Sequence, residues 1–107
     1  MKEDYMINFL QMEYLVSLYF IEFDKKEVTF SELYKYEAEL NKKIKEKKLS
    51  ICFMSSNNYA IELVKTYPNC FRLLDNSIIS LITEKELISK FISYLSVEVL
   101  SIINLNK

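Results

Sequence analysis

The spacing of apolar residues along the chain predicts four helices and a β-hairpin. Over residues 3–23, two apolar stripes recur every three or four residues, as is typical of a helix. One stripe contains Tyr5, Phe9, Met12, Val16 and Tyr19, and the other contains Ile7, Leu10, Tyr14, Leu18 and Ile21. A helix that is apolar on so many sides should be buried on more than one face. We therefore expect it in the centre of the domain or in a subunit interface.

A second helix is expected from Thr29 to about Lys48. Thr29 and Glu32 have the spacing of a capping box, in which the two residues satisfy each other's backbone N–H groups. The apolar positions on one face are Leu33, Tyr36, Leu40 and Ile44. Residues 28–30 could first form a short extended stretch. Residues 51–53 fit either a strand or a tight apolar connection, because periodicity cannot decide over so few residues.

A third helix is expected over residues 57–67, capped by Ser55 or Ser56 and ended by Pro68. Ala60, Val64 and Tyr67 should face inward. The positions expected to face outward are Asn57, Asn58, Ile61, Glu62 and Lys65.

Residues 71–82 predict a hairpin with a two-residue turn at Asp75-Asn76, because Asp and Asn tolerate positive φ. Thr83 and Glu86 match a second capping box, and the last helix is expected to run to about Ile103. Its apolar residues have the 4-3-4-3 spacing of a heptad seam: Ile88, Ile92, Leu95, Val99 and Ile102.

The expected fold class is α+β, mostly helical, with the order α-α-α-β-β-α in a single domain over residues 1–107. This order resembles a winged helix-turn-helix domain with extra terminal helix packing. The segments that carry the resemblance are "EVTFSELYKYEAEL" for the strand and second helix, "SSNNYAIELVKTYP" for the recognition helix and "FRLLDNSIISLI" for the wing. Two features depart from that family: the second helix is longer, and the connection "KEKKLSICFM" lacks the customary glycine.

In winged-helix proteins the first residues of the recognition helix enter the major groove, and the wing rests on the backbone or the minor groove. Asn can pair with adenine, and Ser can contact phosphate or base. The resemblance therefore implies DNA contacts from the start of the third helix and from the hairpin. For Ser55 and Ser56 the alternative is a plain capping role.

The charges are unevenly distributed, although the net charge is only −1. Residues 1–41 carry four lysines and nine acidic residues, a net charge of −5, whereas residues 42–72 carry six lysines, one arginine and two acidic residues, a net charge of +5. This basic segment could neutralise phosphates; alternatively, its lysines only complement the dipole of a helix end. The residues expected to bind DNA are Lys42, Lys43, Lys45, Lys47, Lys48, Ser55, Ser56, Asn57, Asn58, Tyr59, Lys65, Arg72 and Asn76.

The two terminal helices carry more apolar surface than one small domain needs, so we expect a homodimer. The alternative is a single large core. The residues expected in the dimer interface are Phe9, Met12, Val16, Ile88, Ile92, Leu95, Val99 and Ile102.

The composition argues against several kinds of chemistry. The chain has no His, the usual general base and commonest metal ligand, and no Gly for a phosphate-binding loop. Cys52 and Cys70 are too few for a structural zinc site, and we expect them to be buried reduced thiols. We therefore expect neither an enzyme nor a metal or cofactor. No signal peptide or membrane span is evident, so a cytoplasmic location is expected.

The function that these observations predict is sequence-specific binding of double-stranded DNA. Small winged-helix proteins of phages and plasmids include the TubR-like adaptors that bind centromeres. That resemblance implies a homodimer that binds DNA repeats and presents them to a filament-forming GTPase. A transcriptional repressor fits the same residues. The alternative is a protein-interaction module, such as a phage inhibitor or an antitoxin-like protein, which would use the apolar terminal helices or the acidic first segment.

Overall fold

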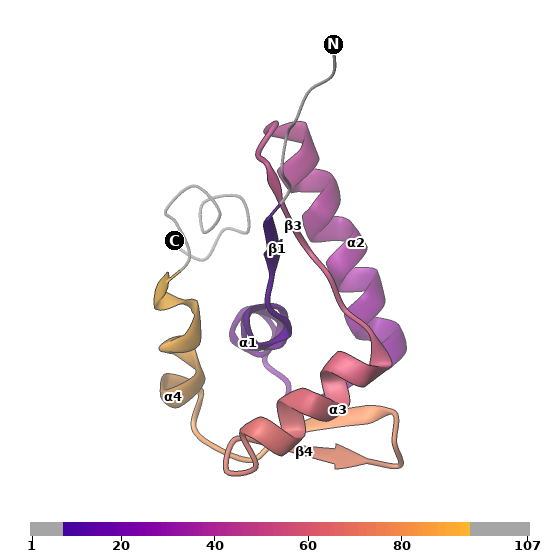
Figure 1. Cartoon of the computed structure of the whole chain (residues 1–107). Coiled ribbons are helices and arrows are strands. Elements are labelled where there is room, and N and C mark those ends of the chain that lie inside the picture. The colour runs from indigo at the N-terminus through magenta and orange to yellow at the C-terminus, as the bar shows by residue number, and fades with distance from the viewer. Residues whose placement is uncertain (1–7, 95–107) are drawn as a thin grey trace.

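A computed structural model describes residues 8–94 of the chain (Figure 1). The elements in chain order are β1 (Asn8–Leu10), α1 (Met12–Glu22), β2 (Glu27–Thr29), α2 (Phe30–Glu46), β3 (Ile51–Phe53), α3 (Asn57–Thr66), β4 (Phe71–Leu74), β5 (Ile78–Leu81), α4 (Lys85–Ser89) and a 3₁₀ turn, η1 (Phe91–Tyr94). The described part is therefore a mostly helical α+β fold.

The hairpin belongs to a three-stranded antiparallel sheet with the order β2-β5-β4. Ile79 at the centre of β5 pairs with Val28 of β2 on one side and Leu73 of β4 on the other. The short extended stretch expected before the second helix is thus the third strand of the hairpin's sheet. Separately, β1 and β3 form a parallel pair in which Leu10 lies opposite Phe53, so residues 51–53 are a strand.

Helix α1 lies in the middle of the molecule, with α2, α3 and α4 around it (Figure 1). Leu15, Val16, Leu18 and Phe20 on this helix are completely buried. The predicted burial of the first helix on more than one face is confirmed, and one core forms around it.

The first helix is shorter than the sequence predicts. It begins at Met12, while residues 8–10 form β1. Pairing with β3 requires an extended backbone there, and this tertiary constraint overrides the helical spacing of the apolar residues. The expected helical residues 3–7 lie outside the described residues.

The last helix also differs from its prediction. Its N-cap is Glu84, whose side chain makes no capping bond, so the capping box expected for Thr83 and Glu86 is wrong. Helix α4 covers only five residues, and η1 follows after Lys90. Of the expected heptad seam, Leu95, Val99 and Ile102 lie outside the described residues.

The residues expected in a dimer interface need a correction. Met12, Val16 and Ile88 are 7, 0 and 0 % exposed within a single chain. Val16 and Ile88 fill the core of the protomer, so the prediction that they form the interface is wrong. Met12 also packs in this core and keeps a small exposed part. Ile92 is half-buried against the same core. The side chain of Phe9 lies outside the described part.

Candidate nucleic-acid interface

Helix α3 begins at the predicted place and leaves one side exposed to solvent. Ser56 is its N-cap, and the Ser56 Oγ accepts a hydrogen bond of 3.1 Å from the Tyr59 N–H. Ala60 and Leu63 are buried, while Val64 and Tyr67 are only half-buried. Leu63 therefore takes the inward place that the sequence predicts for Val64. The exposed residues are Asn57, Asn58, Tyr59, Glu62, Lys65 and Thr66.

The connection from α2 to α3 is held along α2 by a ladder of side-chain hydrogen bonds. The Asn41 amide spans the Phe53 backbone, accepting from its N–H at 2.7 Å and donating to its carbonyl at 3.0 Å. One helical turn earlier, the Glu37 carboxylate accepts from the Ser55 N–H at 2.8 Å and from the Ser55 hydroxyl at 2.7 Å. This ladder fixes the position of the start of α3 against α2.

The last rung of the ladder joins Tyr34 to Asn57, the first residue of α3. The Tyr34 hydroxyl donates to the Asn57 side-chain oxygen. Burial raises the pKa of Tyr34, and the nearby Glu37 carboxylate raises it further, so the hydroxyl stays protonated and remains a donor.

The ladder changes the roles expected for the first residues of α3. Ser55 is bound to Glu37, Ser56 caps the helix and Asn57 is bound to Tyr34. The carboxylate of Glu37 also lies beside the helix start, where it would repel a phosphate. Among the polar residues expected to read DNA here, Asn58 and Tyr59 have exposed side chains without a side-chain hydrogen bond in the described structure.

The hairpin has the predicted turn. Asp75 and Asn76 have φ of 50° and 58°, and the Ser77 N–H donates to the Leu74 carbonyl at 3.1 Å. Both central residues have positive φ, as in a type I′ turn. Strand pairing resumes at Leu74 and Ile78, so Ser77 is an extra residue between the turn and β5. The tip is exposed and polar.

The exposed lysines of the second helix lie far from that tip. Lys42, Lys43 and Lys45 lie near the carboxyl end of α2, and Lys47 and Lys48 lie in the turn that follows. This end of α2 is remote from α3 and the hairpin (Figure 1). Lys42 follows Tyr34 by eight residues, which is about 12 Å along a helix. The structure therefore does not gather the predicted residues into one patch.

Two other basic residues, Lys65 and Arg72, lie on elements that contact each other. Lys65 is exposed near the end of α3, and Arg72 is exposed on β4, which contacts α3. Arg72 lies opposite Ser80 and alternates with the buried Phe71, so it projects from the sheet face away from the core.

The remaining candidate chemistry is limited. Cys52 and Cys70 are half-buried free thiols, and burial raises the pKa of both, which keeps them protonated and weakly nucleophilic. Within residues 8–94, no cluster of His, Cys, Asp and Glu has the makeup of a metal site. No helix in that range is long and apolar enough to cross a membrane.

Comparison of the chain with protein-family models, curated protein sequences and solved structures found no match.

Proposed function

We propose that this protein binds double-stranded DNA through α3 and the β4–β5 hairpin, as a winged-helix domain does. The observation that supports this most is the sheet order β2-β5-β4. It joins the hairpin to the strand that precedes α2, and β4 contacts α3. An exposed helix and an exposed polar turn are thereby held on one framework, as insertion into a groove beside a wing requires.

Within this proposal, Asn58 reads bases and Lys65 and Arg72 contact phosphates. A side-chain amide can pair with the N6 and N7 atoms of adenine. Because the Glu37 carboxylate lies at the start of α3, the DNA phosphates would be attracted by cationic side chains rather than by the N–H groups of the helix start.

The lysines at the end of α2 have a separate place in this arrangement. They begin about 12 Å along α2 from the start of α3. The major groove is also about 12 Å wide. With the start of α3 in the groove, Lys42 and Lys43 at the near end of this group would reach phosphates at its edge, so they would add affinity without adding sequence preference.

The biological role that fits is a homodimer on repeated sites, either as a partition adaptor that presents DNA to a filament-forming GTPase or as a transcriptional repressor. Because Val16 and Ile88 belong to the protomer's core, the dimer would form through other surfaces.

The test is salt-dependent binding to a duplex selected from a random-sequence library, measured by fluorescence anisotropy. Affinity should fall as salt rises, and Lys65→Glu with Arg72→Glu should reduce both the affinity and the salt slope, because phosphate contacts are lost. Lys26→Glu with Lys90→Glu is the matched control, with the same change in net charge away from α3 and the hairpin tip. No selected duplex, or equal losses in both double variants, would favour the protein-interaction module instead.

A further inference from the structure

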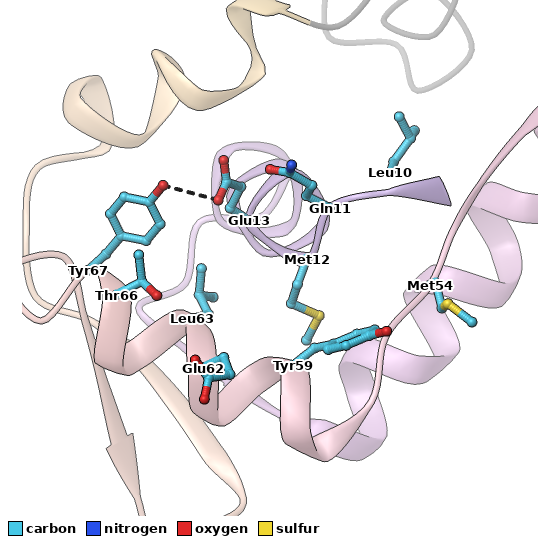
Figure 2. A pocket seen from close by; sticks show the side chains of 10 residues that line it. All are labelled: Leu10, Gln11, Met12, Glu13, Met54, Tyr59, Glu62, Leu63, Thr66 and Tyr67. Carbon is cyan, nitrogen blue, oxygen red and sulfur yellow. Dashed lines mark hydrogen bonds between the residues drawn. The ribbon is translucent and has the colours of Figure 1, made fainter. Parts of the chain in front are cut away.

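We propose that the groove between the start of α1 and α3 binds a basic amphipathic helix of another protein. This inference goes beyond DNA binding and uses the side of α3 next to the proposed DNA surface, with Glu62 between the two. Asn58 and Lys65, which we assign to DNA, do not line the groove. Figure 2 shows the groove, which has a volume of about 370 Å³.

The surface of the groove is apolar. Leu63 and Met12, at 5 and 7 % exposure, lie at its base, with the Met12 side chain next to the Tyr59 ring (Figure 2). Met54 and Tyr59 are 42 and 47 % exposed, which is unusual for large apolar side chains. A partner that covered them would remove this apolar area from water, which is the main driving force for association.

The groove runs along α3. Tyr59, Leu63 and Thr66 line it from successive turns, a distance of about 10 Å along the helix axis. The other wall is formed by residues 10–13, where β1 passes into α1. An open apolar groove beside a helix is the shape that receives an amphipathic helix through anchors at i, i+3 or i+4, and i+7.

The charge of the groove indicates the charge of its partner. Among the residues that the structure describes, Glu13 and Glu62 line it, and no lysine or arginine does. Neither carboxylate forms an ion pair with another described residue. Glu13 instead accepts a hydrogen bond of 3.1 Å from the Tyr67 hydroxyl. A helix with apolar anchors flanked by Lys or Arg would match this surface in both respects.

The experiment uses the full chain without DNA and two fluorescein-labelled peptides of about 16 residues, long enough to form helices. Both carry leucines at i, i+3, i+4 and i+7; one has lysines at the flanking positions and the other has glutamates. The lysine peptide should bind saturably, and the glutamate peptide should bind at least about threefold more weakly, as expected for exposed charge pairs.

Glu62→Lys should weaken binding of the lysine peptide by a similar factor. Glu39→Lys, on the exposed side of α2, should leave that binding unchanged. Circular dichroism would show that both variants fold. Equal binding of the two peptides, no saturable binding up to about 1 mM, or binding unaffected by Glu62→Lys would overturn the proposal. A dimer in sedimentation that Glu62→Lys dissociates would also overturn it, since a second copy would then occupy the groove. None of these outcomes depends on whether the protein binds DNA.

Discussion

Individual residues with positive φ take positions that glycine usually occupies, in a chain that has no glycine. Lys48 has φ 59° and follows α2. The Leu49 N–H donates to the Ile44 carbonyl and the Lys48 N–H to the Lys45 carbonyl. These two bonds define a Schellman motif, whose left-handed position favours glycine. The glycine-free connection is thus a regular helix end.

Lys48→Gly should raise the free energy of unfolding by about 0.5–1 kcal/mol, because the left-handed strain removed exceeds the added freedom of the unfolded chain. Urea denaturation would measure this. Lys47→Gly is the control, since Lys47 has φ −89° and should gain nothing. A Lys48→Gly protein no more stable than the parent would contradict the Schellman assignment.

The capping box at the start of α2 makes stability depend on pH. The Glu32 carboxylate accepts from the Thr29 N–H at 2.9 Å, which lowers the pKa of Glu32 from its ordinary 4.5. A lowered pKa in the folded state contributes stability that is complete above the ordinary value and is lost as pH falls through the folded value. The effect should be modest, because the Glu32 side chain is 46 % exposed.

Glu32→Gln can keep the capping bond but cannot titrate. The melting temperature of the parent should therefore fall relative to that of Glu32→Gln as the pH is lowered from about 6 to about 3. If the melting temperatures of the two proteins changed equally across this pH range, the assigned role of Glu32 would be contradicted.

At the scale of elements, local signals predicted the structure where they were strong. The Thr29 capping box, the Ser56 cap and the Asp75-Asn76 turn are confirmed, because each rests on neighbouring residues alone. The strand β1 could not be predicted, because its partner β3 lies about 40 residues further along the chain. The hydrogen-bond ladder was missed for the same reason, since the i, i+3 or i+4 spacing of Tyr34, Glu37 and Asn41 also suits a solvated helix face.

Variants of two asparagines, Asn41 and Asn58, can distinguish residues that stabilise this region from residues that bind DNA. Asn41→Ala removes both bonds to the Phe53 backbone and should cost about 1–3 kcal/mol of stability, since partly buried backbone groups lose their partner. Asn58→Ala changes an exposed residue and should leave the free energy of unfolding within about 0.5 kcal/mol of the parent. It should weaken binding to the selected duplex by about 1–3 kcal/mol.

Denaturation and DNA titration of both asparagine variants would check these expectations. A loss of stability in Asn58→Ala, or its unchanged DNA affinity, would remove Asn58 from the proposed interface. An unchanged Asn41→Ala protein would show that the ladder does not hold the connection.

At the scale of the whole molecule, the pattern predicted the mostly helical α+β class and the hairpin, but not how the candidate residues are distributed. The basic segment 42–72 is continuous in sequence, yet α2 carries its lysines away from α3 and the hairpin (Figure 1). Net charge along the chain could not reveal this separation, because it depends on the direction in which α2 runs. The sequence pattern also could not predict the groove between α1 and α3, because Met12 and Leu63 have the spacing of ordinary core residues.

The most direct test of the proposed DNA interface is to map it by NMR, following the backbone amide shifts of the ¹⁵N-labelled full chain as the selected duplex is added. We predict saturable shifts in α3 and in the turn between β4 and β5, with smaller shifts at the lysines that end α2, and none in α4. Shifts confined to α4, or a spectrum that the duplex leaves unchanged, would contradict the account.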